Sequence, residues 1–240
     1  MKIDTYFTIP ELDVGAIGDA TVVVIDVVRA TTTIIEALAN GARAIYPTTS
    51  TEDAVRLAAS MGREDTLLCG ERKGRKVEGF DLGNSPGEYT EEAVRDMKLV
   101  MSTTNGTKAL RVGQEGARLL PCAFTNLGAV ANEVKTDEHL VIICAGQEDS
   151  FSLDDALCAG HLAKRVLGEA GGDENVNDAT RAALALASVQ EPTREVLSRA
   201  AGGAAVIEIG LADDLDICAD VDRHDIVVLM SDQAIRRAGG

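Results

Sequence analysis

The fold is decided by residues 21–41, which begin Thr21-Val22-Val23-Val24-Ile25-Asp26-Val27-Val28 and continue through Arg29 into Ala30-Thr31-Thr32-Thr33-Ile34-Ile35-Glu36-Ala37-Leu38-Ala39-Asn40-Gly41. The first part is a short run of mostly β-branched apolar residues, which is typical of a strand buried on both faces. The second part has apolar residues at helical spacing and ends before a glycine, which predicts a helix over Ala30–Asn40. A buried strand that leads directly into a helix is the first half of a β–α–β unit.

Strands and helices alternate in the same way through most of the chain. Apolar runs predict further strands at Ala42–Tyr46, Thr66–Cys69, Lys98–Ser102, Arg118–Pro121, His139–Cys144 and Ile226–Met230. Helical periodicity predicts helices at Thr51–Met61 (with Thr51 as N-cap), Asn105–Val112, Thr125–Val134, Ser152–Ala170, Ala179–Ser188, Pro192–Ala200 and Asp213–Ala219. Residues 204–209 fit a helix or a strand, residues 171–175 a turn, and residues 70–90 a long loop.

This alternation predicts an α/β fold, with a layered, mostly parallel sheet, helices on both faces and a helix-rich C-terminal third. The length suits a single domain over residues 1–240, or two lobes at about 1–145 and 146–240 around a cleft. In such sheets ligands bind beyond the carboxyl ends of the strands, so polar residues at these ends are the candidates for function.

The composition excludes several classes of partner and compartment. The net charge of −16 disfavours nucleic acid and anionic membranes as partners, and an anionic ligand would need a locally positive pocket. The five cysteines form no CxxC pair, so free buried thiols in a reducing cytoplasm are expected, without a zinc site. Apolar runs are too short to span a bilayer, and the charged N-terminal residues do not form a signal peptide, which predicts a cytoplasmic protein.

A hydroxyl-rich turn separates the predicted strand ending at Ser102 from the helix that follows. It reads Thr103-Thr104-Asn105-Gly106-Thr107. Backbone N–H groups at a helix start, together with short hydroxyl donors, form a cradle for a phosphate or sulfonate group. The alternative is an ordinary capping segment, because hydroxyls before a helix commonly serve that purpose.

An acid and an arginine follow the first buried strand. Asp26 can bind a metal ion or act as a base, and Arg29 can grip a phosphate oxygen. The alternative is a buried Asp–Arg pair, with Thr31 capping the helix. An aspartate in so apolar a run needs a partner in either case, because an unpaired buried charge is costly.

Three more polar clusters lie at strand ends or in the long loop. Gly70-Glu71-Arg72 is either functional or a surface salt bridge, and Glu78-Gly79-Phe80-Asp81-Leu82-Gly83-Asn84-Ser85-Pro86 is either functional or a turn-rich loop. The last cluster runs from Gly146 through Ser152-Leu153-Asp154-Asp155, after the predicted strand that ends at Cys144. Ser152 and Asp155 resemble a capping box in which Ser152 is the cap, and the twin carboxylates can also hold a divalent ion.

The shared position of these clusters favours Mg²⁺-assisted phosphate chemistry. Mg²⁺ prefers oxygen ligands and commonly bridges to a substrate phosphate. The sequence contains no Gly-x-x-x-x-Gly-Lys-Ser/Thr loop and no Gly-x-Gly-x-x-Gly after a strand. Gly83-Asn84-Ser85-Pro86-Gly87 has the Gly-x-Ser-x-Gly spacing, but it lies in the predicted loop 70–90 and not at an elbow between a strand and a helix. These features disfavour P-loop, dinucleotide-binding and serine-hydrolase classes.

Four strings resemble the 2-phosphosulfolactate phosphatase (ComB-type) family in order and spacing, namely residues 22–31, 70–72, 78–86 and 103–107. A weaker likeness extends to residues 151–155 and 214–218, so the resemblance covers essentially the whole chain, with Ser102 where many relatives have threonine. The resemblance implies an α/β fold and an Mg²⁺-dependent acid phosphatase. Such an enzyme converts 2-phosphosulfolactate to sulfolactate and phosphate, on the route to coenzyme M in methanogens.

The residues and the resemblance together predict a phosphatase that acts on a small 2-phospho acid. The predicted catalytic residues are Asp26, Arg29 and Asp81, and the predicted Mg²⁺ ligands are Asp26, Glu71, Asp81 and Asp154. The predicted substrate-binding residues are Thr31, Arg72, Asn84, Ser85, Thr103, Thr104, Asn105, Gly106 and Thr107.

Several alternatives stay open at this stage. Water can attack the phosphoryl group directly, or Asp26 can first become phosphorylated. The other class of function is a non-catalytic protein that binds a small anionic metabolite through the same donors. A homo-oligomer is also left open.

Overall fold

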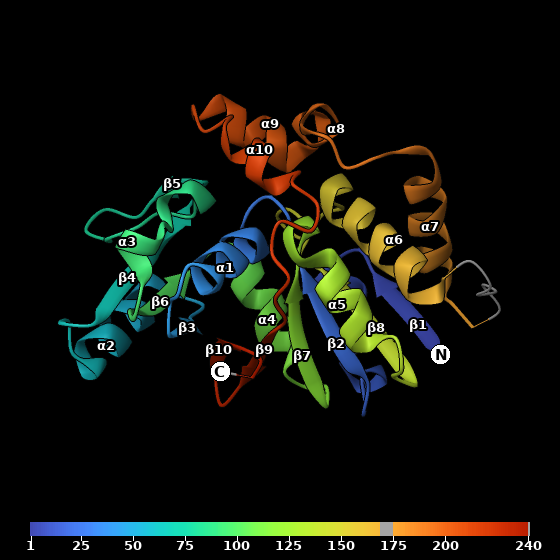
Figure 1. The fold of residues 1–240 in the computed structure, drawn as a ribbon, viewed down its shortest axis with the longest axis horizontal. Coiled ribbons are helices and arrows are strands. Elements are labelled where there is room, and N and C mark those ends of the chain that lie inside the picture. The colour runs from blue at the N-terminus through green and yellow to red at the C-terminus, as the bar shows by residue number, and fades with distance from the viewer. Residues whose placement is uncertain (169–174, 240) are drawn as a thin grey trace.

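The computed structural model describes residues 1–168 and 175–239, in which ten strands form one sheet with the order β1-β8-β2-β7-β9-β10-β3-β6-β4-β5 (Figure 1). The strands are β1 Lys2–Tyr6, β2 Thr21–Ile25, β3 Ala44–Pro47, β4 Thr66–Arg72, β5 Arg75–Lys76, β6 Lys98–Ser102, β7 Arg118–Cys122, β8 His139–Cys144, β9 Val228–Ser231 and β10 Ala234–Arg237. The helices are α1 Ala30–Ala39, α2 Thr51–Met61, α3 Glu91–Val94, α4 Gly106–Gly113, α5 Leu127–Val134, α6 Leu153–Leu167, α7 Asp178–Val189, α8 Arg194–Arg199, α9 Ala201–Glu208 and α10 Asp214–Cys218. Short 3-10 turns lie at η1 Ile9–Glu11, η2 Val14–Ala16, η3 Pro86–Glu88 and η4 Phe124–Asn126.

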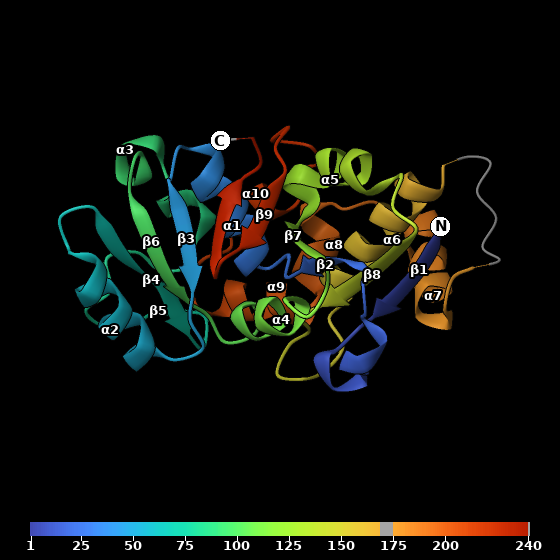
Figure 2. The same ribbon diagram turned by 90° about the horizontal axis from the view of Figure 1, so that it is seen from below.

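The sheet consists of two parallel groups joined by a hairpin. Strands β1, β8, β2 and β7 are parallel to one another, as are β3, β6 and β4. The antiparallel hairpin β9–β10 lies between the groups and pairs with each through one residue pair, Leu119 with Met230 and Ile235 with Ile45. Figure 2 shows the two groups on either side of this hairpin.

Helices cover both faces of the sheet, as the sequence predicts. Along β2, Val22 and Val24 belong to one core cluster and Val23 and Ile25 to the other. The first cluster includes residues of α1 and α4, and the second includes residues of α5 and α6. The mostly β-branched run is therefore buried on both sides, and each such side chain contributes about 1.5–3 kcal/mol to stability.

Several predicted boundaries shift for identifiable reasons. Strand β2 ends at Ile25 because the backbone N–H and C=O of Asp26 both bond the hydroxyl of Thr31 in the next helix. Helix α2 is capped by Ser50, not by Thr51, because the Ser50 side chain accepts from the Asp53 N–H. Helix α6 covers Leu153–Leu167, and the predicted helix end at Ala170 and residues 171–174 of the predicted turn lie outside the described residues.

Other elements were not predicted or were left open. Strands β1, β5 and β10 and the one-turn helix α3 are absent from the predicted set, and the ambiguous segment 204–209 falls mostly within helix α9. The predicted loop 70–90 contains the end of β4, all of β5 and the 3-10 turn η3. The division into two lobes stays a prediction.

Two further predictions concern the cysteines and the membrane. All five cysteines are buried and free, as expected, and burial raises the pKa of Cys69 to about 12, so its thiol is poorly reactive. No helix in the described part of the chain combines the length and the apolar character needed to cross a bilayer.

Candidate functional site

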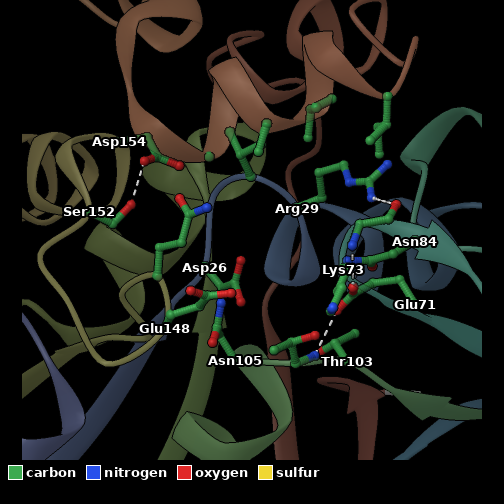
Figure 3. Close-up of a pocket in the computed structure, with 18 of the residues that line it drawn as sticks. Asp26, Arg29, Glu71, Lys73, Asn84, Thr103, Asn105, Glu148, Ser152 and Asp154 are labelled. Carbon is green, nitrogen blue, oxygen red and sulfur yellow. Dashed lines mark hydrogen bonds between the residues drawn. The ribbon is translucent and has the colours of Figure 1, made fainter.

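A cavity of about 580 Å³ lies where the carboxyl ends of β2, β4, β6 and β8 come together, and helix α9 borders it (Figure 3). The carboxyl ends of both parallel groups reach it, although the hairpin reverses the strand direction between them. We attribute this to the twist of about 20–25° per strand, which accumulates over the five steps from β2 to β6. The expected convergence of loops on one pocket is therefore present.

Eight of the predicted site residues line the cavity, and six do not. Those in the wall are Asp26, Arg29, Glu71, Asn84, Thr103, Thr104, Asn105 and Asp154. Those behind or outside it are Thr31, Arg72, Asp81, Ser85, Gly106 and Thr107. Figure 3 shows Asp26 and Asn105 near the centre, Asp154 and Ser152 on one side, and Lys73, Glu71 and Asn84 on the other.

The turn from β2 into α1 fixes Asp26 at the cavity wall. The Asp26 Oδ1 accepts from the Ala30 N–H at 3.2 Å. The Thr31 hydroxyl donates to the Asp26 C=O at 2.8 Å and accepts from the Asp26 N–H at 3.0 Å. Thr31 is thus a support behind Asp26, and the predicted contact of Thr31 with substrate has no counterpart in the cavity wall.

Arg29 is held by two partners from distant parts of the chain. Its Nη1 donates to Asp214 Oδ2 at 2.7 Å and its Nη2 donates to the Gly74 C=O at 2.6 Å. The Ser85 hydroxyl also donates to Asp214, on the other carboxylate oxygen. The charge of Arg29 is therefore matched by a buried carboxylate, and Ser85 lies behind the site as part of this support.

Glu71 ties two loops together. Its Oε2 accepts from the Gly74 N–H and its Oε1 accepts from the Thr104 N–H, both at 2.7 Å. Both carboxylate oxygens are therefore engaged by the backbone, which leaves Glu71 poorly placed as a metal ligand. Next to it, the Arg72 guanidinium donates to the side chain and the C=O of Ser102.

The hydroxyl-rich turn combines the two roles that the sequence left open. Thr103 acts as a local cap, since its Oγ1 accepts from the Thr107 N–H and its C=O accepts from the Thr107 hydroxyl. By contrast, the buried Thr104 Oγ1 has no hydrogen-bond partner. Gly106 is required by close packing, because a Cβ there would lie 2.8 Å from Asp26 Oδ2. The turn therefore lies directly against the Asp26 carboxylate.

Two more buried oxygens on the cavity wall have no partner. They are Asn84 Oδ1, from the loop before η3, and Gln147 Oε1, from the loop after β8. Within the described residues, only four buried side-chain N or O atoms have no partner, and these two and Thr104 Oγ1 are three of them. Because buried polar atoms are normally hydrogen-bonded, this concentration is expected where a polar ligand or ordered water binds.

The start of α6 contributes Asp154 and Asp155. Ser152 is the N-cap residue but makes no capping bond; its hydroxyl donates to Asp154 instead, so the predicted capping box is wrong. Asp155 accepts from the Val27 N–H at 2.8 Å and from the Gly146 N–H at 3.1 Å, which joins the ends of β2 and β8.

Asp81 lies away from these residues. Its Oδ2 accepts from the Leu68 N–H at 2.7 Å and pairs with Arg63 at 2.8 Å. Its carboxylate thus holds the long loop against β4, and the predicted catalytic and metal-binding position of Asp81 is not part of the cavity wall.

Carboxylates outnumber cations around the cavity. Six carboxylates line it, from Asp26, Glu71, Glu148, Asp154, Asp155 and Glu208, against three cations, from Arg29, Lys73 and Arg75. The expected positive pocket is therefore wrong. Where these carboxylates are charged, they repel an anionic ligand.

The pKa values of the buried acids reflect this crowding. Burial raises the pKa of Asp26 to about 7, and the charges of Asp154 and Glu71 act in the same direction. Burial also raises the pKa of Asp154, against the hydrogen bond from Ser152. Burial, followed by the charges of Asp154 and Asp26, raises the pKa of Asp155 well above its usual range. Perturbed carboxyl groups in a cleft are typical of functional sites.

Sequence reasoning missed part of the wall. Lys73 and Arg75 come from the β4–β5 hairpin, and Gln147 and Glu148 come from the loop after β8. Gly74 offered a weak signal, because glycine readily adopts the positive φ that a two-residue hairpin requires. The apolar face that α9 presents to the cavity carried no such signal. Its members are Gly202, Ala205 and Val206, and Ile209 follows directly after the helix.

Comparison with known proteins gives one consistent result. Residues 6–233 match the family model described as 2-phosphosulpholactate phosphatase. A protein named probable 2-phosphosulfolactate phosphatase from Clostridium novyi (strain NT) is 36% identical over 228 residues, which cover 95% of this chain and 96% of the relative. Proteins of the same name from Synechococcus sp. (strain CC9605) and Gloeobacter violaceus are each 41% identical, over 98% and 92% of both chains, respectively.

Proposed function

The chain belongs to the 2-phosphosulpholactate phosphatase family and is a phosphoric monoester hydrolase, and from this premise we propose that its substrate is 2-phosphosulfolactate or a closely related small 2-phospho acid and that Mg²⁺ serves the reaction. Water would cleave the bond between phosphorus and the ester oxygen. The products would be the 2-hydroxy acid, sulfolactate in the first case, and inorganic phosphate.

One observation carries this proposal. Asp26, Asp154 and Asp155 are all buried and all line the cavity, and none of them forms an ion pair within the described residues. Their pKa values are all raised, which means that the protein alone does not compensate their charge. Burial of unpaired carboxylates is costly, which supports the proposal that a cation is their partner.

The donor set fits Mg²⁺ held by few protein ligands. Asp26 and Asp154 are the carboxylates proposed to hold it, since the backbone engages both oxygens of Asp155 and of Glu71. No group of three or more histidine, cysteine or acidic side chains is arranged to bind a metal in the part of the chain that the structure describes. Mg²⁺ characteristically uses one or two carboxylates and completes its shell with water and substrate phosphate.

When bound, Mg²⁺ would neutralise charge on the phosphoryl oxygens. The chain itself supplies the remaining contacts. Thr104 and Asn105, at the start of α4, would donate to the phosphoryl group, and the Gly106 backbone keeps that group close to Asp26. Asn84, which lines the opposite wall, would donate to the phosphoryl group through the NH2 of its side-chain amide. The fixed placement of these donors provides most of the catalysis in phosphoryl transfer.

Arg29 would contribute fixed N–H donors at the wall, since Asp214 and Gly74 hold both ends of its guanidinium and Asp214 matches its charge. Asp26 is the central carboxylate of the proposal. Direct attack by water and a phosphorylated Asp26 are its two chemical routes. Rapid quenching of a single turnover, followed by borohydride reduction, separates them, because an aspartyl phosphate is reduced to homoserine whereas a free carboxylate is not.

The decisive experiment measures phosphate release from 2-phosphosulfolactate and from 2-phospholactate. We expect release from the purified protein, loss of release after EDTA treatment and recovery on addition of Mg²⁺. Release that is insensitive to EDTA would overturn the metal requirement. Absence of release from both esters, in the presence of Mg²⁺, would overturn the substrate class.

A further inference from the structure

A basic turn projects into the cavity from the side opposite Asp154. It joins β4 to β5 through Lys73 and Gly74, whose φ angles of 52° and 76° form a tight two-residue hairpin. The strand pair aligns Arg72 with Arg75, so two cations flank the turn. Lys73 and Arg75 line the cavity, and Figure 3 shows Lys73 across it from Asp154.

The turn is held rigidly by groups already described. The Gly74 N–H donates to Glu71 at 2.7 Å, and the Gly74 C=O accepts from Arg29 at 2.6 Å. A Cβ at Gly74 would lie 2.9 Å from the Cδ1 of Ile209, just after α9, so the turn also packs closely against this end of the helix. The backbone of the turn is therefore fixed while its basic side chains extend from it.

The side chains of Lys73 and Arg75 have no partner in the part of the chain that the structure describes. Neither makes a side-chain hydrogen bond or an ion pair with any of the described residues. The third cation in the wall, Arg29, is matched by Asp214. The positive charge left for a ligand is therefore concentrated at one edge of the cavity, opposite the carboxylates that need a cation.

We propose that Lys73 and Arg75 bind the acid groups of the substrate, its carboxylate and sulfonate, and thereby select acid-bearing phosphate esters over neutral ones. This inference rests on the proposed function. The cavity is then divided by charge, with the phosphoryl group and its cation at Asp26 and Asp154 and the acid groups at the basic turn. The guanidinium of Arg75 presents a planar fork that suits carboxylate and sulfonate oxygens, and Lys73 supplies a point charge.

Three phosphate esters test this assignment, because they differ in the number of acid groups. Isopropyl phosphate has none, 2-phospholactate has one and 2-phosphosulfolactate has two. In Lys73→Gln and Arg75→Gln, kcat/KM for 2-phosphosulfolactate should fall about tenfold in each variant, as expected for loss of a charged contact. The fall should be smaller for 2-phospholactate and smallest for isopropyl phosphate. Comparison of each variant with the wild type on the same ester removes differences between leaving groups.

Lys76 provides a matched control on the same hairpin. It is adjacent to Arg75 in β5, so its side chain points to the other face, where its Nζ lies 3.4 Å from the Asp81 C=O. Lys76 does not line the cavity. Lys76→Gln removes the same charge from the protein, and we expect it to leave the order and ratio of the three esters unchanged.

Calorimetric binding of sulfolactate gives a second readout that does not depend on turnover. The wild type should bind it more tightly than Lys73→Gln or Arg75→Gln, by about tenfold. Equal losses on all three esters, or equal sulfolactate binding in wild type and variants, would overturn the inference. If the wild type releases no phosphate from any ester, the proposed function fails, and the binding measurement still decides the role of the basic turn.

Discussion

The two sides of the cavity differ in how their charges are satisfied. On one side, which we call the network side, Arg29, Asp214, Ser85, Glu71 and the Gly74 backbone bond one another. On the other side, the carboxylate side, Asp26, Asp154 and Asp155 lie together without a cation in the described chain. The first arrangement fixes loops, whereas the second retains unmatched charge. The comparison fits the proposed function, in which the network side holds the loops in place and the carboxylate side takes part in the chemistry.

The largest expected effect comes from the carboxylate side. Asp26→Asn should reduce phosphate release at least about a thousandfold, because it removes charge from the central carboxylate. The amide that replaces the carboxylate keeps its shape and can still accept from the Ala30 N–H, so the fold should persist. Steady-state kinetics with circular dichroism on the same sample check both statements. Turnover within about tenfold of the wild type would remove Asp26 from the centre of the mechanism.

The network side should respond in the opposite way, through stability. Asp214→Asn leaves the guanidinium of Arg29 buried without a counter-charge, and loss of one partner of a buried pair costs about 3–5 kcal/mol. Urea denaturation should show this loss. The neighbouring Asp213→Asn is the control, since the Asp213 side chain is fully exposed and its closest cation, in Arg194, is 3.8 Å away. Equal stability of the two variants would mean that Arg29 does not depend on Asp214.

The sequence predicts some strands of the sheet and fails to predict others. The apolar runs of β2, β6 and β8 are predicted because full burial needs a recognisable composition. Strand β1 mixes polar and apolar residues, and β10 is paired on both sides in mid-sheet through few residues, so neither has a local signature. A strand of this kind is defined by its neighbours rather than by its own residues.

At the site too, the sequence predicts where residues lie in the fold but not which groups they bond. The position of Asp26, Thr104 and Asn105 at strand ends is predictable from topology. The sequence does not reveal that Glu71 is engaged by two backbone N–H groups, because that depends on where residues 74 and 104 lie in space. Asp214 is separated from Arg29 by 185 residues, so their pairing also requires the folded chain.

The carboxylate side should also give the apo protein a characteristic pH dependence. The pKa of Asp26 in the folded state, about 7, lies above its unfolded value near 4. The folded state therefore binds more protons between these values, and this contribution to stability is present below about pH 4 and is lost as pH rises through 7.

Asp26→Asn removes the titrating carboxyl group, so the variant should not lose this stability as pH rises. In EDTA, the variant should match the wild type near pH 4 and exceed its stability above pH 7, by an amount on the order of 2–4 kcal/mol. Thermal denaturation at several pH values measures the difference. A variant that is less stable than the wild type at pH 8 would show that Asp26 is already compensated within the protein.

The smallest effect is expected at Asp81, which contacts neither side of the cavity. Its carboxylate accepts from the Leu68 N–H and pairs with Arg63, whose side chain is about half exposed. Asp81→Asn keeps an acceptor for the N–H and loses a partly screened ion pair, so stability should fall by about 1 kcal/mol or less. Phosphate release should stay within about twofold of the wild type, since uncoupled surface substitutions seldom alter a distant site.

The same charge is removed here as in Asp26→Asn, so the pair separates the effect of location from the effect of charge. A thousandfold loss at Asp81 would mean that the long loop enters the cavity during turnover, and the boundary between the two sides would have to include it.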